Sequence, residues 1–113
     1  MAYNETLANR VREIIADAGE ENVEEKTMFG GLCFMVNNKI CVAVKKDSML
    51  VRLNPNLYEQ ALEKEGVTPM ARQGTGMKGY IFVSDEFLQT QPDLQYWVKL
   101  ALQFNPIAKA SKK

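Results

Sequence analysis

The sequence predicts an α+β fold of two layers, in which an antiparallel β-meander carries helices on one of its faces. Two observations predict this class. Four short apolar segments rich in β-forming residues crowd into residues 25–53, with connections far shorter than the dozen residues that a parallel crossover needs. Helical periodicity is confined to the segments before and after them. A length of 113 residues suits one domain. We expect this domain to span residues 1–104 and a flexible basic tail to cover residues 105–113.

The first helix is predicted over residues 4–18. Asn4 is a suitable N-cap and Gly19 a suitable C-terminal stop. The apolar residues between them recur at helical spacing, at Leu7, Val11, Ile14, Ile15 and Ala18. The acids and arginines of this segment then fall on its exposed side.

The four predicted strands are short and are separated by turn-forming residues. They cover Thr27–Phe29, Leu32–Val36, Ile40–Lys45 and Met49–Leu53. Gly30-Gly31, Asn37-Asn38 and Lys46–Ser48 separate them. Close spacing of this kind predicts that each strand pairs with the next one along the chain.

The second half of the chain predicts a helix, a strand and a final helix. Asn54-Pro55 opens the helix, as cap and first helical residue, and Gly66 ends it. A loop follows over residues 67–79, with a short extended piece around residues 70–73. Tyr80–Val83 is the next strand, and a helix with strong apolar periodicity runs from Pro92 to Phe104. The predicted order is α-β-β-β-β-α-β-α. Leu32–Val36 or Tyr80–Val83 would present an open sheet edge, which keeps a homodimer among the expectations.

Composition excludes several classes of function. The chain has no histidine, which removes imidazole bases and histidine metal ligands. Its apolar runs are too short for a membrane span, and charged residues interrupt the N-terminal stretch where a secretory signal would be apolar. We therefore expect a cytoplasmic protein without membrane contact. The formal net charge is zero, which argues against nucleic-acid binding by this chain alone.

The two cysteines, Cys33 and Cys41, flank the Asn37-Asn38 turn. In a two-residue hairpin Phe34 faces Cys41 and Cys33 faces Val42, which places the two sulfurs on opposite faces of the sheet. A longer loop would shift this register and bring them to one face. We expect buried free thiols, and no metal or cofactor.

Two glycine-containing segments and two cations are the candidate binding features. Gly74–Gly79 matches the GxGxxG pattern, but it precedes a strand instead of opening a helix, so we interpret it as a lead-in to the sheet. In it, Gly79 allows a bulge or a close backbone approach. One interpretation is structural: Arg52 pairs with an acid on a neighbouring strand, and Lys78 reaches into solvent. In the other, both line one rim and face an anion or an acidic partner surface.

Three strings carry a resemblance to a known family. They are Met28-Phe29-Gly30-Gly31-Leu32-Cys33-Phe34-Met35, Leu50-Val51-Arg52-Leu53 and Met77-Lys78-Gly79-Tyr80-Ile81-Phe82-Val83. With the closing helix Leu94–Phe104, they resemble the N-terminal domain of the TfoX/Sxy family over about residues 7–104. The resemblance implies a secretion-chaperone-like α+β domain. It also implies an association with bacterial regulators of competence, although the second, C-terminal domain of those regulators is expected to be absent here.

The expected function is that of a non-enzymatic regulatory module that acts through protein contacts, with the transcription machinery as one candidate partner. We expect no catalytic residues. The predicted binding surface consists of the positions that match the family strings: Met28, Phe29, Gly30, Gly31, Arg52, Met77, Lys78, Gly79 and Tyr80. The alternative is a small anion- or metabolite-binding domain that uses Arg52, Lys78 and the Gly74–Gly79 loop.

Overall fold

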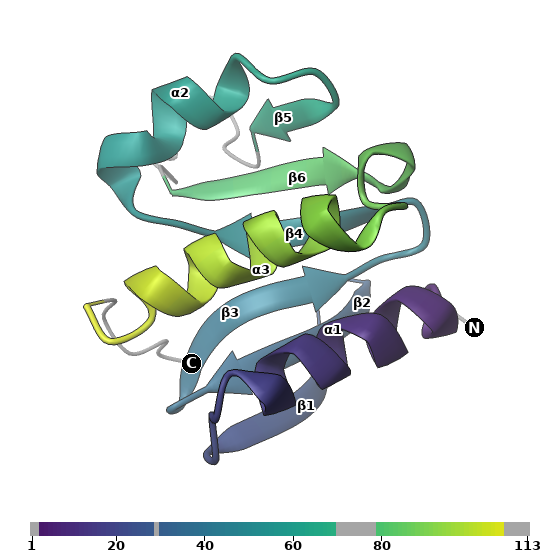
Figure 1. Cartoon of the computed structure of the whole chain (residues 1–113), viewed down its shortest axis with the longest axis vertical. Coiled ribbons are helices and arrows are strands. Elements are labelled where there is room, and N and C mark those ends of the chain that lie inside the picture. The colour runs from purple at the N-terminus through teal and green to yellow at the C-terminus, as the bar shows by residue number, and fades with distance from the viewer. Residues whose placement is uncertain (1–2, 29, 70–78, 108–113) are drawn as a thin grey trace.

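The structure, a computed structural model, describes residues 3–28, 30–69 and 79–107 (Figure 1). Within these ranges the chain forms three α-helices, two short 3-10 helices and a six-stranded sheet. The elements are α1 (Glu5–Asp17), β1 (Val23–Met28), β2 (Gly31–Val36), β3 (Lys39–Val44), β4 (Ser48–Arg52), η1 (Pro55–Leu57), α2 (Tyr58–Leu62), β5 (Val67–Pro69), β6 (Tyr80–Ser84), η2 (Asp85–Phe87) and α3 (Gln91–Phe104). The α+β class predicted from the sequence is confirmed.

All neighbouring strands of the sheet are antiparallel, in the order β1-β2-β3-β4-β6-β5. The predicted meander is therefore present as β1 to β4, and β6 pairs with β4. The predicted element order was wrong in one respect, because it omitted β5. This strand has only three residues, too few to show a periodicity. It also ends in Pro69, a residue that occurs in strands mainly at sheet edges and therefore argues against a strand in a sequence.

The two edges of the sheet are β1 and β5. The expectation that Leu32–Val36 or Tyr80–Val83 forms an open edge was wrong, since β2 lies between β1 and β3, and β6 lies between β4 and β5. β1 also begins at Val23, four residues before the predicted Thr27. After Val23 its next residues, Glu24, Glu25 and Lys26, are charged and exposed, as an edge strand permits, so the segment carries little apolar signal.

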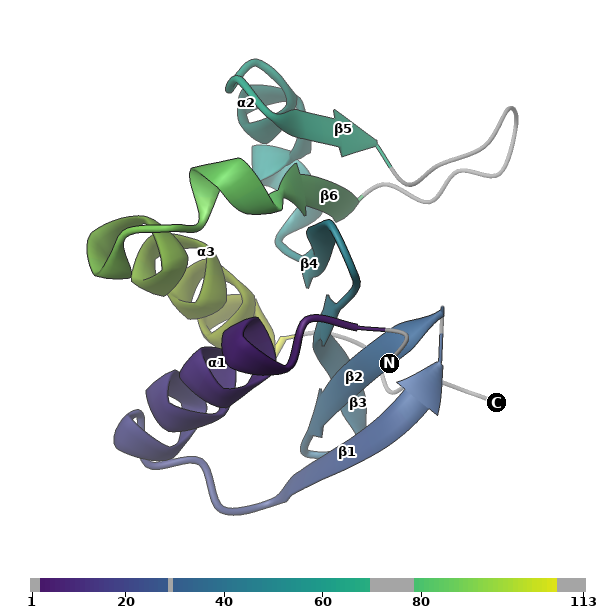
Figure 2. The same cartoon turned by 90° about the vertical axis from the view of Figure 1, so that its right-hand side faces the viewer.

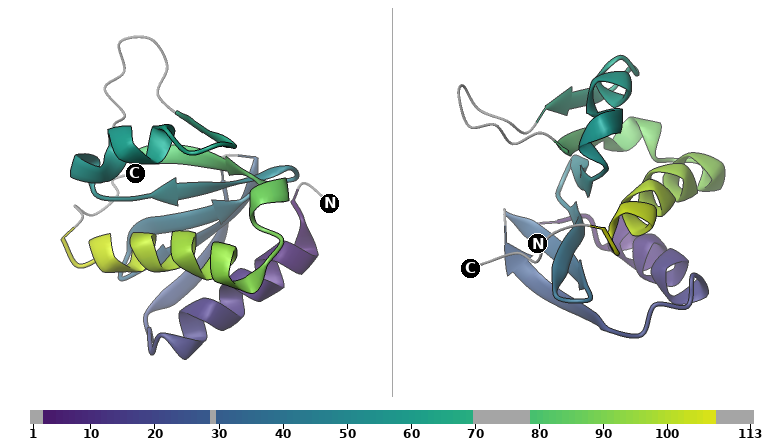
Figure 3. Two further views of the ribbon diagram at one scale, coloured as in Figure 1. Left: turned by 45° about the horizontal axis from the view of Figure 1, so that its top comes forward. Right: turned by 90° about the vertical axis from the view of Figure 1, so that its left-hand side faces the viewer.

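Both long helices cover the same face of the sheet (Figure 2). The core between them combines the buried face of α1, the buried face of α3 and alternate residues of the strands, such as Phe34, Val42 and Val51. α2 lies beside β5 and β6, at the sheet edge opposite β1 (Figure 3). A smaller apolar cluster lies on the helix-free face, formed by Cys33, Met35, Ile40, Ala43 and Leu50, with Tyr80 and Phe82 packed against it.

The β2–β3 hairpin turns at Asn37-Asn38, as predicted. Both asparagines have positive φ angles, 55° and 66°, which is the conformation of a two-residue type I′ turn. The predicted register was wrong by one residue. Met35 faces Ile40 but Phe34 faces Val42, so Cys41 is the extra residue of a β-bulge that the sequence pattern does not reveal.

The C-terminal end of α3 is fastened to this hairpin by Asn105. Its side-chain amide donates to the carbonyl oxygen of Val36 at 3.0 Å and accepts from the amide of Asn37 at 2.9 Å. The ammonium group of Lys39 donates to the Asn105 carbonyl oxygen at 2.9 Å. Asn105, the first residue of the expected tail, is therefore buried, and residues 108–113 lie outside the described residues.

Candidate functional site

The described residues of the predicted binding surface fall into two groups at opposite ends of β4. Gly30 and Gly31 lie beside the β3–β4 turn, where Ser48 begins β4. Arg52, at the other end of β4, faces Tyr80 in β6. Four residue steps along β4 separate the two ends, about 13 Å at the usual strand rise. Among the residues that the structure describes, the two groups are therefore too far apart to hold one small ligand between them, and the larger protein-binding surface stays a prediction.

Gly31 has a packing reason to be glycine. A Cβ atom built there would lie 2.2 Å from the carbonyl oxygen of Val44, which no side chain can accept. Gly30 precedes it with a φ angle of +72°, in the left-handed region that favours glycine. The Gly-Gly step thus supplies the turn between β1 and β2 and the close approach of β2 to β3.

Arg52 lies among aromatic rings at its end of β4. Its guanidinium carbon is 5.3 Å from the ring centroid of Tyr80 and 5.9 Å from that of Phe104, within the range of cation–π attraction. Gly79 precedes Tyr80 with a φ angle of +97°, and its carbonyl oxygen accepts from the Leu53 amide at 2.8 Å. A Cβ at Gly79 would lie 2.9 Å from the Leu53 carbonyl oxygen, so the predicted close backbone approach is confirmed.

Several predicted residues cannot be placed in this arrangement. Phe29, Met77 and Lys78 lie outside the described residues, as does the Gly74–Gly79 loop up to residue 78, and Met28 is described only as the last residue of β1. The common rim proposed for Arg52 and Lys78 therefore stays a prediction.

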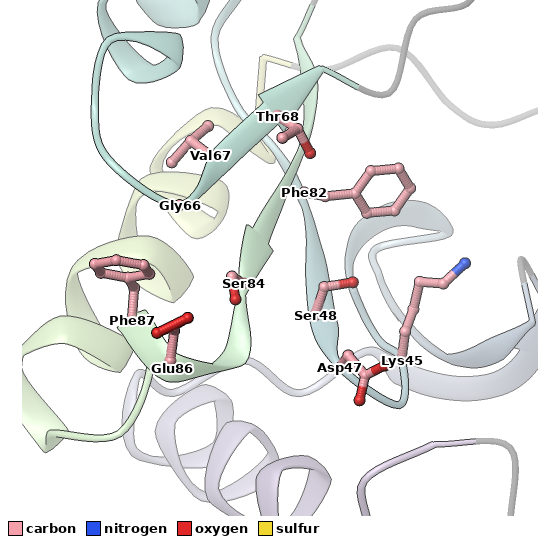
Figure 4. A pocket seen from close by; sticks show the side chains of 10 residues that line it. All are labelled: Lys45, Asp47, Ser48, Gly66, Val67, Thr68, Phe82, Ser84, Glu86 and Phe87. Carbon is pink, nitrogen blue, oxygen red and sulfur yellow. The ribbon is translucent and has the colours of Figure 1, made fainter.

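A hollow of about 500 Å³ lies where the β3–β4 turn, the start of β5 and the end of β6 meet (Figure 4). It is lined by Lys45, Asp47, Ser48, Gly66, Val67, Thr68, Phe82, Ser84, Glu86 and Phe87. None of these residues was a predicted site residue. The only signal in the sequence was the polar run Lys46–Ser48 between two predicted strands, which is typical of a turn.

The side chains of this hollow offer groups of mixed charge. Ser48 and Ser84 face each other on β4 and β6, and Thr68 faces Phe82 on β5 and β6. The Lys45 ammonium lies 5.3 Å from the Phe82 ring centroid, and Asp47 and Glu86 add carboxylates. Such a set can hydrogen-bond a small polar ligand. Without any histidine in the chain, the two serines lack the base that most often activates a hydroxyl nucleophile.

The two cysteines are free and buried, as predicted. Cys33 belongs to the apolar cluster of the helix-free face and Cys41 to the core beneath the helices, which confirms that they lie on opposite faces. Burial raises the pKa of Cys33 to about 11 and that of Cys41 to about 12. Both thiols therefore stay protonated at neutral pH, which makes them poor nucleophiles and poor metal ligands.

The described residues form neither a metal-binding cluster nor a membrane-spanning helix. Among the residues that the structure describes, no three His, Cys, Asp or Glu side chains converge as a metal site would require. Within the same ranges, no helix combines the length and the apolar character of a membrane span.

Comparison with protein families decides the relationship of the chain. The family model described as TfoX N-terminal domain matches residues 13–105. The chain belongs to the TfoX N-terminal domain family. The resemblance inferred from the three strings is thereby confirmed, and the matched range extends from the middle of α1 to the buried Asn105. No curated protein and no solved structure matches the chain.

The range that matches the TfoX N-terminal domain contains the whole sheet and both groups of predicted surface residues.

Proposed function

We propose that this TfoX N-terminal domain is a cytoplasmic, non-enzymatic regulatory module that acts by binding another protein, with the bacterial transcription machinery as the partner to test first. Family membership supports the regulatory association. The observation that carries the protein-binding part of the proposal is the edge strand β1, which has six residues and a single neighbour within the described part of the chain.

The alternation of hydrogen-bonded residues along β1 identifies the backbone groups that a partner strand would bind. The Asn37 amide donates to the Asn22 carbonyl oxygen at 2.8 Å, and in an antiparallel pair every second residue bonds the same neighbour. The backbone groups of Glu24 and Lys26 are therefore directed at β2. Those of Val23, Glu25 and Thr27 are directed away from the sheet, as a strand-addition partner requires.

The side chains of β1 would select the added strand by charge. Glu24, Glu25 and Lys26 are all exposed. Glu25 is held by Arg12 through two bonds of 2.6 and 2.8 Å, on the helix side of the sheet. Glu24 and Lys26 share the other side, because alternate residues share a face. An extended segment with a basic and an acidic residue two positions apart matches this pattern.

The first test compares the unchanged chain with Thr27→Pro in crosslinking pull-downs from the native host. The Thr27 amide is directed away from β2, so proline there blocks strand addition without removing a bond to β2. We expect the variant to fold, as checked by circular dichroism, and to lose the transcription-associated partners that the unchanged chain recovers. Glu86→Gln, far from β1, is the matched control and should retain them.

Equal recovery of the same partners by the unchanged chain and by Thr27→Pro would contradict the role of the β1 edge. A homodimer through β1 is a separate outcome of this test. It would appear as self-crosslinks and a doubled mass in light scattering, both lost in Thr27→Pro.

Binding of a small anion or metabolite is the second candidate function. It is favoured by the position of Arg52, directly opposite Tyr80 and next to the Gly79 turn in the register of β4 and β6. An anion that uses Arg52 and Lys78 should raise the melting temperature of the unchanged chain. The same anion should have no effect on an Arg52→Ala, Lys78→Ala double variant. Equal stabilisation of both proteins would exclude this site.

A further inference from the structure

A second hollow, of about 310 Å³, lies between the turn that follows α2 and the first two turns of α3. Its lining residues are Lys64, Glu65, Phe87, Asp93, Tyr96 and Trp97. Half of these six side chains are aromatic. We call this site the aromatic hollow, and it is distinct from the β1 edge and from the hollow of Figure 4, with which it shares only Phe87.

Two of the three rings, those of Trp97 and Phe87, are packed against the rest of the protein, and the third is exposed. Trp97 is 5% exposed and anchored in the core, whereas the neighbouring Tyr96 is 46% exposed. Their ring centroids are 4.9 Å apart with an interplanar angle of 77°. Phe87 packs against Gly66, where a Cβ would lie 2.2 Å from the phenylalanine ring. The Phe87 ring can therefore occupy this position only because Gly66 has no side chain.

The charges around the rings select the sign of a ligand. Glu65 and Asp93 contribute two carboxylates and Lys64 one ammonium, which leaves a formal charge of −1 on the lining (−2 + 1). The Lys64 ammonium lies 5.2 Å from the Tyr96 ring centroid. The chain's own lysine thus already uses a tyrosine ring of this hollow as a cation-binding surface.

We infer that the aromatic hollow binds an organic ammonium group, either the head of a small molecule or the end of a lysine side chain. Aromatic rings attract cations through the negative charge of their faces, and the two carboxylates add to that attraction. An anionic ligand would meet both carboxylates. The volume lies at the lower end of ligand pockets, about 300–1,000 Å³, which suits a head group better than a large ligand.

The experiment uses the fluorescence of Trp97, the one tryptophan in the sequence. The full chain is titrated with tetramethylammonium chloride and, in parallel, with sodium chloride at the same ionic strength. We expect a saturable change in Trp97 emission with the organic cation only. A third titration uses the neutral isostere of choline, in which carbon replaces nitrogen. It should produce little change.

Two variants connect the signal to the hollow. Tyr96→Leu should weaken binding about 2- to 30-fold, the range of a lost cation–π contact, and the exposure of Tyr96 makes a folding defect easy to separate by circular dichroism. Lys64→Met should strengthen binding about threefold, the factor for removing a like charge roughly 6 Å away in water. The same titration is then made with choline and with Nα-acetyl-lysine methylamide, whose side-chain ammonium is free. The compound that saturates shows whether the bound ammonium group belongs to a small molecule or to a lysine side chain.

Three results would overturn the inference. They are the absence of a saturable Trp97 signal, equal binding of the neutral isostere, and unchanged binding by folded Tyr96→Leu. None of them bears on the β1 edge, since Thr27→Pro leaves the aromatic hollow intact.

Discussion

Replacing Asn105 with alanine tests whether the end of α3 is fastened to the β2–β3 hairpin. The substitution removes the side-chain bond to the Val36 carbonyl oxygen and the bond from the Asn37 amide. It leaves the backbone carbonyl that accepts from Lys39 in place. Asn105 is only 2% exposed, so water replaces the lost amide poorly.

The expected loss of stability is about 2 kcal/mol, from two bonds at roughly 1 kcal/mol each. For a chain of 113 residues, the entropy of unfolding is about 0.24 kcal/mol/K at about 2.1 cal/mol/K per residue. The melting temperature should therefore fall by about 8 °C. Urea unfolding followed by Trp97 fluorescence and by circular dichroism gives the free energy independently.

Asn37→Gly is the matched control. Glycine accepts the positive φ angle of this position, and only the bond between the two side chains is lost. Asn37 is exposed, so water can take its place and the loss should stay below about 1 kcal/mol. The reasoning is refuted if Asn105→Ala costs no more than Asn37→Gly.

Three further predictions concern packing, pH and thiol chemistry. Gly31→Ala should cost about 1–3 kcal/mol in urea unfolding, because its Cβ would meet the Val44 carbonyl oxygen at 2.2 Å. A cost well below about 1 kcal/mol for Gly31→Ala would contradict the contact. The bond to Arg12 lowers the pKa of Glu25, so its stabilisation is present above the ordinary glutamate pKa and is lost as pH falls through the lowered value. In Glu25→Gln, the change in unfolding free energy across that acidic range should be smaller than in the unchanged chain, by at most about 1 kcal/mol, as for a surface ion pair. An unchanged pH profile would contradict this. Cys33 and Cys41 should react with iodoacetamide at pH 8 far more slowly in the folded chain than in urea, because burial raises the pKa of both thiols. Mass spectrometry measures the labelling, and fast labelling of the folded chain would contradict this reasoning.

The fold class was predictable from the sequence because its signals are local. Asn37-Asn38 and Gly30-Gly31 mark turns within a few residues of the strands that they connect. β5 could not be predicted, because Val67–Pro69 becomes a strand only by pairing with β6, beyond a connection of ten residues. The bulge at Cys41 also depends on the pairing partner, which a pattern along one strand does not contain.

The hollows were beyond sequence reasoning for a related reason. Ser48 and Ser84 are neighbours only through the β4–β6 pairing. Lys64 and Tyr96 come together only when α3 packs beside the turn after α2. Gly31 was predicted at a turn and Gly79 at a bulge or close backbone approach, but the carbonyl oxygens that they approach, those of Val44 and Leu53, are distant in sequence and could not be named.

The position of β6 between β4 and β5 divides the chain into two interlocking pieces. Residues 3–69 contain β4 and β5 with a gap between them, and residues 79–107 supply the strand and the helix that fill it. Separate expression of the two pieces should therefore allow reassembly by fragment complementation. β6 would restore hydrogen bonds on both of its sides, and α3 would return Leu94 and Val98 to the core. If each piece were fused to one of two interacting proteins, reassembly of the domain would show that those two proteins had come into contact.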